Sequence, residues 1–184
     1  MRAVIACTLL VAALLARADA DDAIARAIDP AHSRATFSVR HVFVDRVTGA
    51  IPIVSGNVTL APDSSIPRAV SAQLAPAGVS SGDRDRDASL ASADFFDAKA
   101  FPLWTFASTK IAAVDATHGT IDGNLTIHGV TQPVHLDVVV RGDPTHLQYH
   151  AVAHLDRHRF GMNVTRLDPA IGADVEIALD ITLK

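Results

Sequence analysis

The sequence predicts an all-β domain, either a sandwich or a barrel, and three features of its residue pattern support this. Apolar residues alternate with polar ones or form short runs, and turn residues interrupt them about every 8–12 positions. Long amphipathic stretches with a helical period are missing from the pattern. Gly129, which permits a positive φ, and Pro133, which fits only at a strand start or a sheet edge, indicate a tight hairpin over residues 127–134. Its short connection makes the neighbouring strands antiparallel.

Residues 1–20 have the composition of a secretory signal peptide. Arg2 gives a positive start, residues 3–16 form an apolar run, and Ala18-Asp19-Ala20 fits a small-x-small cleavage site. A membrane-spanning helix is the alternative, but the run is shorter than the roughly 20 residues that cross a bilayer, and acidic residues follow at once. We therefore expect residues 21–184 to form one exported domain, periplasmic or secreted, with no stable membrane insertion after signal removal.

The charge and the cysteine content of the sequence exclude a nucleic-acid partner and a disulfide framework. The chain carries 16 Lys and Arg against 20 Asp and Glu, a formal net charge of −4. A weakly acidic domain has no basic field to attract phosphate backbones, so we expect no nucleic-acid partner. The single cysteine, Cys7, lies inside the signal segment, so the exported domain depends on core packing without disulfides.

Eight strands are expected along the domain. They cover residues 34–43, 53–60, 69–79, 103–114, 120–128, 132–141, 147–155 and 174–183. On the first of them, Phe37, Val39 and His41 share one face, while Thr36 and Ser38 share the other. This alternation is typical of a half-buried strand.

Residues 83–100 break the β pattern and predict a short helical insert between two strands. Asp83 or Asp85 can cap the helix, and Pro102 marks the return to extended chain. Arg86 and Asp87 have the chemistry of a head-group site or an acid–base pair, but adjacent residues on a helix do not face each other. We expect this pair to anchor the insert on the barrel. A second irregular stretch is expected over residues 157–172, as a loop or short helix.

Three separated blocks of sequence carry a family resemblance. The first comprises Ile28-Asp29, His32-Ser33 and Phe37-Ser38-Val39-Arg40-His41; the second, Arg86-Asp87, Leu90, Ser92, Asp94-Phe95-Phe96-Asp97, Phe101-Pro102 and residues 105–109; the third, residues 123–134, Arg157, Phe160-Gly161-Met162 and residues 172–175. In these blocks the chain resembles the YceI-like family, exported lipocalin-like barrels that bind polyisoprenoid and related lipids. Ser89, where a histidine is usual, and residues 48–51, which lack the usual aromatic residue after the glycine, depart from that pattern.

The resemblance implies an eight-stranded antiparallel lipocalin-like barrel with a short helical insert, a lumen occupied by a long apolar chain, and often a homodimer. A barrel of this size is filled by its own side chains or leaves room for one small ligand. We expect the lipid-binding residues to be those that share inward faces or close the barrel end: Phe37, Val39, His41, Phe96, Trp104 and Phe106. Ordinary core packing is the alternative for each aromatic ring. His41 must find a hydrogen-bond partner, either a ligand head group or a structural one, or face water at the barrel mouth.

The nine histidines raise a metal hypothesis. His146, His150, His154 and His158 recur every four residues, but strand neighbours at that spacing lie more than about 13 Å apart, too far to share an ion. His154, Asp156 and His158 are closer in sequence, and an exposed weak site is the alternative for them. The sequence has no Gly-x-Ser-x-Gly elbow and no glycine-rich phosphate cradle after a strand. We therefore expect no metal, no cofactor and no catalytic residues.

The leading hypothesis is an exported, non-enzymatic protein that sequesters or transports an isoprenoid or fatty-acyl lipid in its lumen, with the polar head at the barrel mouth. One alternative is an enzyme or enzyme partner that acts on a quinone-like or sulfur substrate through lumen histidines, which two or more contacting histidines in the lumen would favour. Another is a small interaction domain whose dimer surface is the functional part, which a narrow lumen and a large apolar interface would favour.

Overall fold

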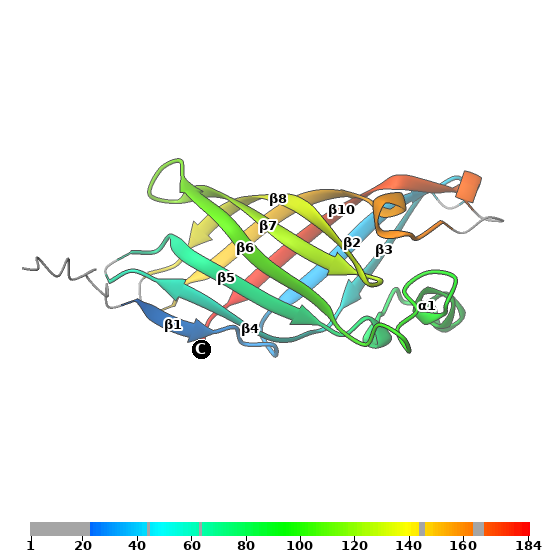
Figure 1. Ribbon diagram of the computed structural model, residues 1–184, viewed down its shortest axis with the longest axis horizontal. Coiled ribbons are helices and arrows are strands. Elements are labelled where there is room, and N and C mark those ends of the chain that lie inside the picture. Colours follow the sequence, from blue (N-terminus) through cyan, green and yellow to red (C-terminus); the bar gives the residue numbers. More distant parts are fainter. Residues whose placement is uncertain (1–22, 44, 63, 144–145, 164–167) are drawn as a thin grey trace, which may run out of the picture.

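One antiparallel sheet curls around a lumen and gives the molecule its elongated shape (Figure 1). The structure is a computed structural model that describes residues 23–43, 45–62, 64–143, 146–163 and 168–184. Its ten strands follow the order β1-β4-β5-β6-β7-β8-β9-β10-β2-β3 in the sheet. Their bounds are β1 Ile24–Ala27, β2 Arg34–His41, β3 Asp45–Ile51, β4 Ile53–Leu60, β5 Pro67–Leu74, β6 Trp104–Ala113, β7 His118–Ile127, β8 Val130–Arg141, β9 Gln148–Asp156 and β10 Ile171–Thr182.

The all-β class, the antiparallel pairing and the short insert are confirmed, but the described chain has ten strands instead of eight. The two strands that the sequence pattern missed are β1 and β3. β1 has only four residues. β3 begins with the exposed Asp45 and Arg46 and contains Gly49, so its apolar alternation is weak. Pro52, which has no N–H to give to a ladder, separates β3 from β4.

Segments far apart in the sequence close the sheet at one end of the barrel. Lys184 donates its backbone N–H to the carbonyl of Ala27 at 2.9 Å, and Ile28 forms a β-bridge with Leu183. β1 pairs on its other side with β4. Strands β1 and β4 to β10 therefore surround the lumen here, and backbone bonds between residues 27–29 and 182–184 join the two edges of the sheet.

The opposite end carries the insert and two short 3-10 helices, η2 (Arg157–Phe160) and η3 (Asp168–Ala170) (Figure 1). Asp83 caps α1 (Arg84–Ala91) by accepting from the backbone N–H groups of Asp85 and Arg86. A further 3-10 helix, η1 (Pro76–Gly78), leads into the insert. Residues 76–79 were expected as the end of a strand, but Pro76 cannot donate to a ladder and the chain turns there.

Arg86 and Asp87 hold the segment that leads into the helix. Arg86 Nε donates to Ser81 Oγ at 2.7 Å, and an Asp87 carboxylate oxygen accepts from the Ser81 backbone N–H at 2.7 Å. The preceding Ser80 forms a β-bridge with Ala50 of β3. The pair therefore ties α1 to a segment that pairs with the sheet, as expected from the sequence.

The predicted hairpin joins β7 to β8 through His128 and Gly129, which have φ of 53° and 74°. Two consecutive positive φ values are typical of a type I′ turn. Pro133 lies in the part of β8 that pairs with β7 but precedes the pairing with β9, which begins at Asp137. Hydrogen-bonded pairs alternate along an antiparallel ladder and begin here with Ile127 and Val130 beside the turn, so Pro133 falls in a non-hydrogen-bonded pair with Asn124. The missing N–H of Pro133 therefore removes no bond from either ladder.

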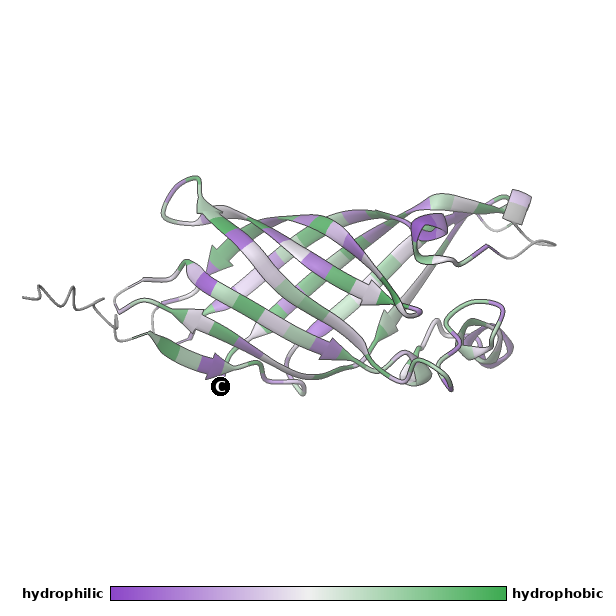
Figure 2. Cartoon of the chain, viewed as in Figure 1, coloured by the Kyte–Doolittle hydropathy of each residue, from purple (hydrophilic) through white to green (hydrophobic). Residues whose placement is uncertain are grey.

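Hydrophobic residues alternate with hydrophilic ones along the strands (Figure 2). The inward side chains form two buried clusters, one among β4 and β7 to β9 and one beneath the insert and η2. No helix in the described ranges is long and apolar enough to cross a membrane. The expected signal segment, residues 1–20, lies outside the described residues.

The ring of Phe37 packs over a glycine of the neighbouring strand. Gly49 of β3 is the cross-strand partner of Phe37, and a Cβ added there would lie 2.5 Å from the tip of the ring. At Gly172, in the strand on the other side of β2, the nearest atom to such a Cβ is 3.4 Å away. The ring of Phe37 therefore occupies the space that a side chain at position 49 would need.

We predict that Gly49→Ala lowers the free energy of unfolding by about 1–3 kcal/mol, because the ring must leave its rotamer or the backbone must shift. Gly172→Ala is the matched control and should change it by less than about 0.5 kcal/mol. Urea denaturation of both variants checks this. Equal stability of the two variants would contradict the close packing at Gly49.

Candidate functional site

Two adjoining cavities lie inside the barrel. The larger, of about 140 Å³, lies among the strands, and the smaller, of about 80 Å³, lies beneath the insert and η2. Apolar side chains make up nearly all of both walls. The residues that border both cavities, and so mark where they meet, are Phe37, Ile51, Trp104, Ile127, Leu155 and Ile177.

Small inward side chains leave the larger cavity open. On β9, the buried Tyr149, Ala151, Ala153 and Leu155 alternate with outward residues, and all four line that cavity. Ala35 of β2 lines it as well. Because alanine ends at Cβ, the middle of the lumen contains fewer side-chain atoms than a barrel packed with leucine and phenylalanine.

An aromatic cluster stands where the cavities meet. The ring of Phe96, from the insert, packs edge-on against Trp104 of β6 and Phe37 of β2, with centroid distances of 4.8 and 6.5 Å. All three side chains are buried. Such edge-to-face contacts contribute about 0.5–1.5 kcal/mol each beyond the area they bury. They therefore fix the insert to the two strands.

The structure brings together five of the six residues that the sequence predicted for the lumen. Phe37 and Trp104 line both cavities, Phe106 lines the larger, and Val39 and Phe96 line the smaller. Phe95, the residue before Phe96 in the insert, is also buried and lines the smaller cavity. Contact of these residues with a ligand remains a prediction.

His41 is the sixth predicted residue, and it lines neither cavity. Its ring lies 5.6 Å from that of Phe43, which is 79% exposed, and its Nδ1 accepts from the Phe43 backbone N–H at 3.3 Å. The pairing of β10 with β2 is irregular between Ile171 and Val175, opposite this end of β2. The inward face of β2 therefore extends beyond the lumen at His41.

The polar groups of the larger cavity wall are bonded to backbone oxygens. Thr36 Oγ1 donates to the carbonyl of Ala178 at 3.1 Å, and the Tyr149 hydroxyl donates to that of Ser65 at 2.9 Å. Burial raises the pKa of Tyr149 to about 12, so its hydroxyl stays a neutral donor at physiological pH. Neither group is left to bind a charged ligand.

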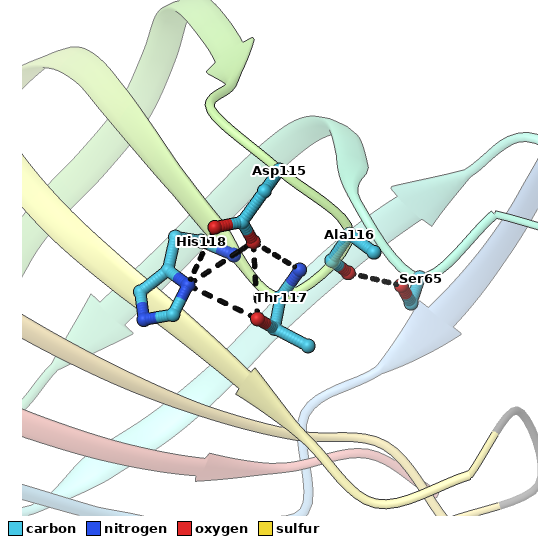
Figure 3. A network of polar contacts seen from close by, with 5 residues as sticks. All are labelled: Ser65, Asp115, Ala116, Thr117 and His118. Carbon is cyan, nitrogen blue, oxygen red and sulfur yellow. Dashed lines mark hydrogen bonds and ion pairs between the residues drawn. The ribbon is translucent and has the colours of Figure 1, made fainter.

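Polar contacts tie the turns together at the closed end of the barrel (Figure 3). Asp115 accepts from the backbone N–H groups of Thr117 and His118 at 2.7 and 2.8 Å, and these bonds hold the pKa of its carboxyl well below its usual range. Ser65, from the loop between β4 and β5, donates to the carbonyl of Ala116 at 3.5 Å. The backbone carbonyl of the same Ser65 accepts the hydrogen bond from the Tyr149 hydroxyl, so the turns and the lumen wall are connected.

Arg157 is a buried charged residue whose role the sequence did not reveal. It borders the smaller cavity, is 4% exposed, and donates to the carbonyls of Met162 at 2.6 Å, Ile171 at 2.9 Å and Gly172 at 3.0 Å. The guanidinium therefore holds the chain after η2 against the start of β10. The sequence did contain an indication of this role, because Arg157 precedes an irregular stretch with glycine and proline, where an arginine can donate to carbonyls that no ladder pairs.

The histidines lie outside the lumen in the described part of the chain, since neither cavity wall contains one. The feature that would favour a lumen enzyme, contacting histidines, is therefore not found there. Each histidine of the metal hypothesis has its own aspartate: His146–Asp143 at 3.5 Å, His150–Asp180 at 2.8 Å, His154–Asp174 at 3.3 Å and His158–Asp156 at 3.8 Å. Within the described ranges, no group of three or more possible ligands is placed to hold a metal ion.

His135 belongs to the same outer surface. Its Nδ1 lies 2.6 Å from a carboxylate oxygen of Asp122 on β7, and its Nε2 lies 3.7 Å from Asp137. The hydrogen bond to Asp122 raises the pKa of His135 above its ordinary value of 6.5. The pair is half exposed, so solvent screens it.

Comparison with known proteins gives a family match over most of the chain. The model of the YceI-like domain matches residues 27–183. A UPF0312 protein from Pseudomonas putida (strain W619) is 32% identical over 114 residues, which make up 61% of this chain. The match spans 58% of that relative, less than two thirds of its length.

Solved structures share the fold. BcnA of Burkholderia cenocepacia superposes with a TM-score of 0.78 at 22% identity, over 85% of this chain and 99% of that one. A polyisoprenoid binding domain from Saccharophagus degradans superposes with a TM-score of 0.64 at 13% identity, over 86% and 97% of the two chains. At these identities the likeness concerns the fold.

We predict that Arg157→Met destabilises the protein by about 3 kcal/mol or more, because buried carbonyls lose a charged donor. Arg159, two residues along, donates to Gln132 on the surface, so Arg159→Met should cost at most about 1 kcal/mol. Chemical denaturation of both variants measures this difference in the free energy of unfolding. A similar small cost for both variants would show that the guanidinium contacts do not hold this segment.

The His135–Asp122 pair should stabilise the fold at acid pH only. A pKa raised by folding contributes stability that is fully present below the unfolded value of 6.5 and is lost as pH rises through the folded pKa. Asp122→Asn should therefore cost up to about 1 kcal/mol at pH 5.5 and less above pH 8. NMR titration should show a lower His135 pKa in this variant and an unchanged one in Asp174→Asn. An unchanged value in Asp122→Asn would refute the pairing.

Proposed function

The chain belongs to the family of YceI-like domains, and from this premise we propose that it is an exported binding protein that sequesters or transports an isoprenoid or other long-chain amphiphilic lipid in its lumen. One observation carries the proposal, the cavity of about 140 Å³ with apolar walls inside the barrel. The name of the Saccharophagus degradans fold neighbour, a polyisoprenoid binding domain, supports it. Export rests on the signal-like residues 1–20.

The size of the cavities sets how a long tail would lie. Apolar cavities of about 150 Å³ hold a molecule such as benzene, so the larger cavity alone takes only part of a lipid tail. A longer tail would pass the place where the cavities meet, enter the smaller one, and move side chains apart. Phe96 stands at that place and comes from the insert, which forms no ladder with β6 or β2.

The hydrophobic effect supplies enough free energy for such binding. Each CH₂ group moved from water into the lumen contributes about 0.8 kcal/mol, so ten groups contribute roughly 8 kcal/mol before the cost of association is subtracted. No charged group of the ligand needs a partner inside the lumen for this gain. Tail burial therefore gives the affinity, while a polar head at the barrel mouth can remain in water.

Ala153→Phe should block the larger cavity. Ala153 lines that cavity, whereas its neighbour Val152 points outward on the same strand, so Val152→Phe is the matched control. We predict that Ala153→Phe lowers the affinity for geranylgeraniol at least about tenfold, at an overpacking cost of about 1–3 kcal/mol that leaves the fold intact. Native mass spectrometry measures the complex. Wild-type binding by Ala153→Phe would contradict a ligand in this cavity.

A further inference from the structure

Trp104 carries a polar atom that the fold leaves unsatisfied. It is the first residue of β6, is 6% exposed, and borders both cavities. Its indole Nε1 is buried and, within the described part of the chain, has no hydrogen-bond partner. No other buried side-chain nitrogen or oxygen of the described residues lacks one.

An unpaired donor is costly in this place. A buried N–H without an acceptor costs about 1–3 kcal/mol relative to a paired one, and buried tryptophans usually find a partner. A phenylalanine would fill much of the same space without that cost. The ring of Phe96, which packs against Trp104, is apolar and offers no acceptor oxygen.

The other polar groups on the cavity walls already donate hydrogen bonds to backbone carbonyls. Thr36 and Tyr149 each donate to a backbone carbonyl, and Arg157 donates to three. A phosphate or carboxylate buried beside the indole would need several donors or a cation to replace its hydration. A single neutral N–H group can instead be satisfied by one hydrogen bond to an uncharged oxygen.

We propose that the ligand carries an uncharged acceptor oxygen, such as that of a carbonyl, ester or ether, and that this oxygen accepts a hydrogen bond from Trp104 Nε1 where the two cavities meet. The inference rests on the proposed function and names its ligand class. Nε1 is buried, so the oxygen reaches it when a group that covers it moves aside. Phe96, at 4.8 Å on the insert, is the neighbour least constrained by the sheet.

The chain has a single tryptophan, so one indole signal in a ¹H–¹⁵N spectrum reports this bond in the native protein. The probes are methyl palmitate and nonadecane, which have equal numbers of heavy atoms and differ in the ester group. Delipidated protein should bind both. The indole proton should move downfield with methyl palmitate and stay near its place with nonadecane, because only the ester offers an acceptor.

Trp104→Phe should lower the affinity for methyl palmitate about five- to tenfold relative to that for nonadecane, which corresponds to one net hydrogen bond. The ratio of the two affinities cancels any change in cavity size. An indole proton that moves equally with both probes, or an affinity ratio unchanged by Trp104→Phe, would overturn the inference and leave the proposed function standing. If neither probe binds, the proposed function fails and the inference with it.

Discussion

The lumen depends on where the barrel has small inward side chains. A sheet of this curvature is normally filled by its own core, and here Ala35 of β2 and Ala151 and Ala153 of β9 stand at inward positions on the two sides of β10. The space that they leave becomes the larger cavity because the surrounding strands are held by ladders and cannot collapse inward. The apolar walls, the aromatic cluster and the unpaired indole N–H all border this space, so the roles proposed for them in ligand binding depend on it.

The two ends of the barrel are built differently. At one end the sheet is closed through Ile28 and Leu183, and Ser65 connects a turn with the Tyr149 hydroxyl in the lumen wall. At the other end irregular segments cover the lumen: the insert, bonded through Ser81, and η2, after which Arg157 bonds the carbonyl of Met162. These segments are held by side-chain contacts with few ladder hydrogen bonds, so we expect a ligand to enter the lumen at this end.

Local chemistry explains what the sequence could predict. Alternation on β2 placed Phe37 inward, Gly129 identified the hairpin, and the choice of Asp83 or Asp85 as the helix cap contained the residue that caps it, Asp83. Each of these depends only on near neighbours in the chain. What remained hidden depends on distant contacts. The polar β3 is a strand because β2 lies beside it, and Arg157 is buried because carbonyls of Met162, Ile171 and Gly172 converge on it. His41 obeys the alternation of β2 but lies beyond the lumen.

A lipid in the lumen is the claim on which this account of the protein depends. The most direct measurement is mass spectrometry of an organic extract of the protein, purified from the cells that produce it without added detergent. The expected result is one class of long-chain amphiphile at close to one molecule per chain. An extract without lipid, together with no uptake of added isoprenoid or fatty-acyl lipid by the same preparation, would contradict the claim.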